Sequence, residues 1–410
     1  MTKARSSQIQ KARGIRIRII GLGGGGCSIV AEMSQRLPSV NFIAADTDLV
    51  NLQRVKNDHL ALFSFGSEST CGLGTGMNFA LGEKIAKESM DEIKSLFMDV
   101  DLFILVTCLG GGIGSGAAPI FAKAARESNA LGMGVFTMPF AFEGQKRQRL
   151  AQQSLRESAP YLDAQLILSN EKIFEVAGNQ TSFSAALSLI NQNLIDNLNA
   201  LLEIIRQPSL INIDFSDLKA ILHGHEQNAF LNSVTTQGEK RLEDALQGIT
   251  HYDFYYSDPM PAQKVLLHIS GGSDLKMAEV SMISQGVKKP NPGAQIIFGV
   301  DRKNDFKDKI RVVLLSISAI KSKASDAPEK KVMRKKKEQN KNIKKKVKKN
   351  PASSQKSKRT NISDEAKNIK VKKVKRLNAL DVKEQKKKSE FQKTSQEKLW
   401  EIPAFMRRKS

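Results

Sequence analysis

Cysteine is scarce in this sequence, which holds only Cys27, Cys71 and Cys108 among its 410 residues. Three scattered cysteines are too few for a disulfide framework and lack the spacing of a zinc site. We therefore expect reduced thiols in a reducing compartment. The five histidines show no convincing ligand spacing either, so the sequence predicts no metal site built from protein ligands alone.

Long apolar runs are also missing, because no stretch reaches the ~18 residues that a membrane span requires. Residues 1–14 are basic and polar and lack the apolar centre of a signal peptide. We expect a disordered N-terminal extension over residues 1–14 and a cytoplasmic protein.

Acidic residues are few only at one end of the chain. Residues 321–410 hold 32 of the 64 Lys and Arg residues but 10 of the 42 Asp and Glu residues, which leaves 32 of each class in residues 1–320. The net charge of +22 therefore belongs to the tail. Residues 321–397 are polar and poor in apolar side chains, which predicts a disordered basic linker. Residues 398–410 contain the only Trp and an apolar cluster, which is typical of a docking peptide.

Short apolar runs alternate with helical patterns through the first half of the sequence. Buried parallel strands are predicted at residues 15–20, 41–45, 102–106, 132–138 and 165–168, since these runs show no polar alternation. Helices are predicted at residues 76–99 and 115–127. This order indicates a doubly wound α/β domain over residues 15–181, with ligands beyond the carboxyl ends of its strands.

A long helix and a second α/β unit are predicted to follow. Apolar residues recur at helical spacing over residues 182–206, so we expect a central helix within residues 182–210. Residues 211–320 are predicted to form the second unit, with strands at 264–269, 295–300 and 311–316 and a helix over 274–283.

Three glycine-rich loops precede helices in the first domain. The first, residues 21–26, has the form G-x-G-x-x-G and lets a backbone approach phosphates at a helix N-terminus. With Asp46 downstream, it leaves NAD-type binding and other phosphate binding both open. The second loop, residues 110–116, favours a polyphosphate held between two loops. The third loop covers residues 72–76, and no Walker lysine is present in the first two.

Charged residues of interest occur in two further segments of the sequence. Glu143 follows a predicted strand and suits ribose hydroxyls, and Arg147 suits phosphate charge. Asp214 and Asp217 are three residues apart at a helix start, where they either cap the helix or orient a water for attack on phosphorus.

Taken in order, these segments resemble FtsZ, the bacterial cell-division family related to tubulin. The similarity covers the first glycine loop, GLGTG, GGGIGSG, PFAFEGQKR, the Asn170 region, NIDFSD and HISGGSDL, and it returns in the terminal EIPAFMRRK. It implies a tubulin/FtsZ-like fold and GTP-dependent head-to-tail filaments that scaffold septation at mid-cell. It also implies GTP hydrolysis at the junction between subunits, with GTP or GDP and Mg²⁺ as cofactors.

The resemblance also implies residue roles. Nucleotide contacts fall on Gly24, Gly25, Gly26, Cys27, Ser28, Gly74, Gly111, Gly112, Ile113, Gly114, Ser115, Glu143, Arg147, Asn170 and Asn191. Catalysis falls on Asn212, Asp214 and Asp217, which one subunit inserts into the site of the next. The docking peptide implies a membrane-tethering partner such as FtsA, bound through Ile402, Pro403, Phe405 and Arg407.

The sequence departs from the family pattern inside the expected pocket. Cys27 and Ser28 replace two Asn, Cys71 replaces an Arg, and Ile113 replaces a Thr. Leu187 stands for the aromatic residue near the base, and Asn191 for the Asp that reads guanine. An amide offers one acceptor oxygen where a carboxylate bonds both N1–H and N2–H, a loss of ~1–3 kcal/mol. We therefore hypothesise weak or slow GTP use with relaxed base preference.

Alternative functions remain open from the sequence. A nucleotide-dependent scaffold without turnover fits the altered pocket, a tubulin-like DNA organiser fits the basic tail, and an NAD-binding oxidoreductase fits the first loop alone. The basic linker also suits nucleic acid or an anionic membrane as partner.

Overall fold

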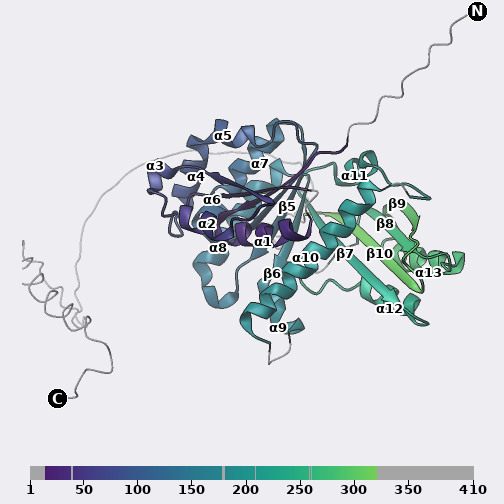
Figure 1. Cartoon of the computed structure of the whole chain (residues 1–410). Helices are drawn as coiled ribbons and strands as arrows, with labels where there is room; N and C mark the ends of the chain where they lie inside the picture. The colour runs from purple at the N-terminus through teal and green to yellow at the C-terminus, as the bar shows by residue number, and fades with distance from the viewer. Residues whose placement is uncertain are drawn as a thin grey trace, which may run out of the picture. The chain divides into compact units, whose positions relative to one another are not determined.

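A ten-stranded sheet organises the part of the chain that the computed structural model describes (Figure 1). The described residues are 14–37, 40–177, 181–207, 209–257, 259 and 261–320. The predicted basic linker and docking peptide, with Ile402, Pro403, Phe405 and Arg407, lie outside them. The strand order is β3-β2-β1-β4-β5-β6-β7-β10-β8-β9.

The first six strands are parallel. They are β1 (Ile17–Leu22), β2 (Asn41–Asp46), β3 (Leu60–Ser64), β4 (Leu102–Cys108), β5 (Leu131–Met138) and β6 (Ala164–Ser169). Successive side chains of a strand enter opposite cores: Ile19 of β1 packs in one, and Ile20 and Leu22 in the other. Because both faces of the inner strands are buried, those strands are mostly apolar, whereas the edge strand β3 is only partly buried. The prediction of a doubly wound parallel sheet is confirmed.

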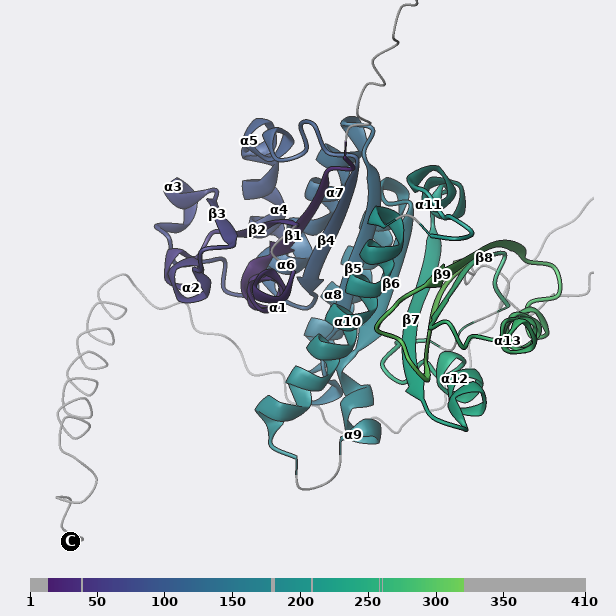
Figure 2. The same ribbon diagram turned by 45° about the vertical axis from the view of Figure 1, so that its right-hand side comes forward.

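Helices cover both faces of these strands (Figure 2). α1 (Gly23–Arg36), α2 (Leu49–Val55) and α10 (Phe183–Arg206) share one core. α4 (Phe79–Glu88), α5 (Met90–Ser95) and α7 (Ala118–Glu127) share the other. The remaining helices of this half are α3 (Ser67–Thr70), α6 (Gly112–Gly116), α8 (Gln145–Ser158) and α9 (Ile173–Val176).

Two predicted helices differ from the structure in their bounds. The stretch 76–99 is not one helix, because Ser89 ends α4 and caps α5. The stretch 115–127 begins earlier, because the short α6 precedes α7, which begins at Ala118.

The predicted central helix is α10. Ser182 caps it by accepting a hydrogen bond from Ala185 N at 3.2 Å. At 1.5 Å per residue its 24 residues span ~36 Å. Its last residue, Arg206, lines a cavity together with Arg16 and Asn41, at the amino ends of β1 and β2. The helix therefore runs the full height of the sheet.

The second half continues the same sheet. β7 (Gln227–Gln237) and β8 (Lys264–Gly271) flank β10 (Lys309–Ala319) antiparallel, and β9 (Gln295–Arg302) pairs with β8 in parallel. α11 (Phe215–Leu222) precedes β7. α12 (Arg241–Ile249) and α13 (Met277–Lys288) pack on the outer strands. The helix predicted at 274–283 begins at Met277 instead, because Asp274 turns back to bond Arg241.

Candidate nucleotide-binding site

A cavity of about 720 Å³ lies at the carboxyl ends of the parallel strands. Its lining comes from the β1–α1 turn, β2–α2, residues 73–77, the β4–α6 turn and the β5–α8 connection. The volume is within the range typical of small-molecule and cofactor sites. The position is the one at which open α/β sheets bind ligands.

The first glycine loop packs tightly against β4. A Cβ on Gly26 would meet Val106 O at 2.4 Å, and one on Gly25 would meet Cys108 Sγ at 2.5 Å. Side chains at these positions would push α1 off the sheet. The loop therefore presents the N-terminal backbone of α1, with its N–H groups and positive dipole end, to the cavity.

The second loop is fixed by hydrogen bonds. Gly110 takes φ +102°, which favours glycine, and its N–H donates to Ser115 Oγ at 2.7 Å. Thr107 Oγ1 lies 3.0 Å from Leu22 O and 3.2 Å from Gly114 O. This buried hydroxyl therefore joins the end of β1 to the second loop and holds the two loops at a constant separation.

Two glycines of the cavity lining have neither a packing reason nor a positive φ. A Cβ on Gly111 would meet nothing within 4 Å, and one on Gly24 would come no closer than 3.5 Å to any atom. Neither residue has a positive φ. Both line the cavity, so a side chain at either position would extend into the cavity. By contrast, a Cβ on Gly112 would meet Thr75 Oγ1 at 2.3 Å.

Glu143 and Arg147 lie at the side of the cavity and form an ion pair with each other. Glu143 Oε1 also accepts a hydrogen bond from Phe140 N at 2.9 Å. Asn170 follows β6 and reaches the same cavity. These three side chains add polar groups to the lining of the cavity.

Two carboxylates also line the cavity, and only Asp46 was singled out in the sequence. Asp46 is buried and accepts hydrogen bonds from Thr47 N and from Asn51 Nδ2, each at 2.8 Å. Burial raises the pKa of Asp46. Asp48 caps α2 by accepting from Asn51 N at 3.0 Å.

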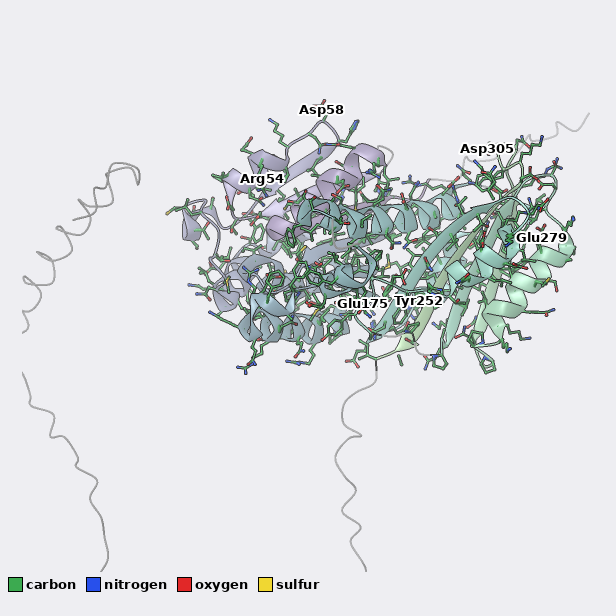
Figure 3. The ribbon with its side chains drawn as sticks, turned by 90° about the horizontal axis from the view of Figure 1, so that it is seen from below. Arg54, Asp58, Glu175, Tyr252, Glu279 and Asp305 are labelled. Atoms are coloured by element: carbon green, nitrogen blue, oxygen red, sulfur yellow. The ribbon has the colours of Figure 1, made fainter. Side chains whose placement is uncertain are left out.

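Asn51 and Arg54 of α2 complete this wall, and Arg54 is labelled in Figure 3. No motif marked either residue, because a seven-residue helix after a strand has no distinctive spacing.

Several predicted residues do not line the cavity: Gly26, Cys27, Ser28, Ser115 and Asn191. The buried Cys27 thiol points under the loop, 3.5 Å from Gly21 O and from Ala45 O. Burial raises the pKa of the Cys27 and Cys108 thiols, so both stay protonated. Ser28 is exposed and donates to Gly24 O at 3.0 Å.

Asn212, Asp214 and Asp217 lie elsewhere, at the start of α11. Asp214 Oδ1 accepts from Asp217 N at 2.9 Å, and Asp217 Oδ2 accepts from Asp214 N at 3.0 Å. The pair is thus a reciprocal capping box. Asn212 Oδ1 accepts from Ser209 N at 3.2 Å. This group follows α10, whose last residue lies beside the amino ends of β1 and β2, and none of its three residues lines the cavity of its own chain.

Over the described ranges, no group of three or more His, Cys, Asp or Glu residues is placed to hold a metal ion. In the same ranges, no helix has the length and apolar character needed to cross a membrane.

Fold and cavity together define an α/β protein with a cavity of ligand size between two glycine loops at the carboxyl ends of its parallel strands. Residues 16–178 match the model of the Tubulin/FtsZ family GTPase domain, and residues 228–319 match the FtsZ family C-terminal domain. The cell division protein FtsZ of Coxiella burnetii is 30% identical over 73% of this chain and 78% of its own length. FtsZ 1 of Pyrococcus furiosus is 32% identical over 73% and 80%.

Solved structures agree. An empty FtsZ dimer from M. jannaschii has a TM-score of 0.66 at 30% identity, over 75% of this chain and 89% of its own. The GTPγS-bound protofilament of CetZ2 from Haloferax volcanii has a TM-score of 0.64 at 21% identity, over 74% and 92%, which shows a shared fold. The chain belongs to the tubulin/FtsZ family.

Proposed function

We propose that this chain binds GTP in the cavity, assembles head to tail into cell-division filaments, and hydrolyses GTP at the junctions between subunits. The observation that carries nucleotide binding is the pair of glycines, Gly24 and Gly111, that packing does not require. Both face a cavity between two helix N-termini, which favour phosphate. Two relatives named as cell division proteins support the biological role.

The position of the two carboxylates supports assembly between copies. Asp214 and Asp217 are at the opposite end of α10 from the cavity, so they cannot reach the ligand of their own chain. A second copy stacked along this direction would bring its α11 over the cavity. Because such a contact is heterologous and repeats, it generates a filament.

Exposed apolar side chains occur at both ends of this axis. Val50 and Leu73, at the cavity, are 73% and 77% exposed, and Leu210, just before α11, is 73% exposed. Apolar groups in such positions are typical of protein contacts. The occupant we propose is another copy, because each copy then covers the exposed residues of the next.

Chemically, the glycine loops would bind the phosphates through backbone N–H groups, and Arg147 would add positive charge. Glu143 would accept hydrogen bonds from the ribose hydroxyls, and Asn170 would accept hydrogen bonds from them or donate to them. Asp214 and Asp217 of the next copy would orient the attacking water. Mg²⁺ fits this site because Asp46 and Asp48 line the cavity, and this ion is usually held by one or two carboxylates together with phosphates. When bound it would neutralise phosphate charge.

The first test is phosphate release with GTP and Mg²⁺ across protein concentrations, with light scattering in the same cuvette. We expect turnover only above a threshold concentration, rising together with scattering. Turnover proportional to concentration from the lowest value would contradict a shared site.

A complementation test is sharper. Gly111→Asp places a carboxylate in the cavity without a clash, because a Cβ there meets nothing. Asp214→Asn removes one charge at the other end. Each variant alone should be inactive. An equal mixture should regain up to about a quarter of the turnover, because the Asp214→Asn cavity then meets an intact α11 from the other variant. No recovery would refute a site shared between copies.

A scaffold without turnover is the second candidate, favoured by the apolar Ile113 in the phosphate loop. GTP-dependent scattering without phosphate release would support it, and Ile113→Thr should then raise turnover.

The tail proposals concern residues outside the described ones. We propose that Ile402, Pro403, Phe405 and Arg407 dock a membrane tether such as FtsA, and that the basic linker serves as a spacer between the filament and this peptide. Deleting residues 398–410 should abolish binding of the tether and keep GTP-dependent assembly. Tail-dependent binding to DNA or anionic liposomes that falls steeply with salt would add a direct role for the linker.

A further inference from the structure

A polar network joins α1, which begins at the first glycine loop, to α10. Asn191 Nδ2 donates to Glu32 Oε2 at 3.1 Å. Glu32 Oε1 pairs with Arg36 at 3.6 Å, and Arg36 donates to Gln192 Oε1. The network therefore fixes the orientation of the Asn191 amide.

Glu32 lies on the same face of α1 as Gly24, which is in the first glycine loop at the start of the helix. Gly24, Ser28 and Glu32 are spaced by four residues, so they follow one face of the helix. At 1.5 Å per residue, Glu32 lies ~12 Å along the helix from Gly24. A nucleotide with its phosphates at Gly24 and its base directed toward α10 would bring the base to this level. This step rests on the proposed function.

The network leaves two acceptors in position. Because the Asn191 amide nitrogen is bound to Glu32, its Oδ1 is the atom left to accept, and none of the described residues donates to it. The Glu32 side chain is 31% exposed, and each carboxylate oxygen can accept a second hydrogen bond. Guanine presents two adjacent donors, N1–H and the N2 amine. Adenine presents an acceptor at N1, and hypoxanthine lacks the N2 amine.

We infer that Glu32 supplies the carboxylate that reads the guanine N2 amine, while Asn191 Oδ1 accepts from N1–H. The negative charge expected at position 191 is thus provided by the neighbouring helix. Guanine preference is retained under this arrangement, in contrast to the relaxed preference hypothesised from Asn191 alone.

The test is calorimetric binding of GDP and of IDP to the full chain and to Glu32→Gln. Diphosphates avoid turnover during the titration. We expect the wild type to prefer GDP by about tenfold or more, the scale of one charge-assisted hydrogen bond. Glu32→Gln should weaken GDP by a similar factor and leave IDP within about threefold, so that the preference is lost.

Two further variants separate base reading from a merely structural role. Arg36→Gln breaks the same network one turn away and should keep the GDP preference. Glu32→Gln combined with Asn191→Asp returns a carboxylate to α10 and should restore it.

The outcomes are distinct. An unchanged GDP:IDP ratio in Glu32→Gln, or an equal loss of both ligands, overturns the role of Glu32 and leaves the proposed function intact. A wild type that binds neither nucleotide overturns the proposed function and this inference with it.

Discussion

Replacing Asp214 by Asn or by Ala separates the two roles that its carboxylate could have. The structure shows a capping box in which Asp214 Oδ1 accepts from Asp217 N at 2.9 Å. Asn caps helices about as well as Asp, whereas Ala cannot cap. Asp214→Ala should therefore lower the free energy of unfolding by about 1 kcal/mol. Asp214→Asn should lower it by only about 0.3 kcal/mol.

Turnover should respond differently. If Asp214 orients the attacking water in the next copy, the neutral Asn loses that function although the cap survives. We expect both variants to lose about 100-fold or more in GTP turnover per subunit, the lower end of what a positioned acid or base contributes. Assembly should persist, since the cavity is unchanged.

The assay pairs urea unfolding with phosphate release and scattering above the threshold concentration. Serine at position 216, which is exposed on the same helix, provides a control through Ser216→Ala. The reasoning would be refuted if Asp214→Asn kept wild-type turnover, because the carboxylate would then be a cap alone. It would equally be refuted if turnover fell only in proportion to lost stability.

Three further predictions concern stability. Gly112→Ala should lower the free energy of unfolding by about 2 kcal/mol through a clash, whereas Gly111→Ala, which meets nothing, should change it by under about 1 kcal/mol, as measured by urea unfolding. Burial lowers the pKa of His268 to about 4, below its unfolded value. The unfolded state therefore binds more protons, so stability should fall as the pH drops from about 6.5 to 4, and His268→Gln should flatten this slope; equal slopes would refute it. Arg241 is buried and bonds Glu279 at 2.9 Å, so Arg241→Met should cost about 3 kcal/mol. Burial raises the Glu279 pKa, but the bonds from Arg241 bring it below its usual value. Part of the wild-type stability should therefore be lost below about pH 4.5, and that loss should be smaller in the variant.

Arg241 and its partner Glu279 lie far from the cavity. Glu279 of α13 and Arg54 of α2 lie far apart in Figure 3. Arg241→Met and His268→Gln are therefore remote from the cavity, and we expect both variants to leave nucleotide affinity unchanged.

Much of the fold could be predicted from the sequence. Buried parallel strands such as β4 and β5 are apolar on both faces, and the long stripe of α10 has a period of 3.6, so local pattern alone was sufficient. β3 and β7 were not predicted. β7 carries polar residues along most of its length because one end of the strand extends beyond the core, and its pairing with β10 joins segments distant in the sequence.

For the site, the sequence by itself determined the glycine loops and the residue types around them, because phosphate binding needs a bare backbone at a helix start. Only the tertiary structure decided which glycines serve packing, as Gly112 does, and which face open space, as Gly111 does. It also placed Asp46 and Asp48 in the cavity and set Glu32 against Asn191. These groups come from separate elements, and their distances depend on how the helices pack on the sheet, which no local pattern records.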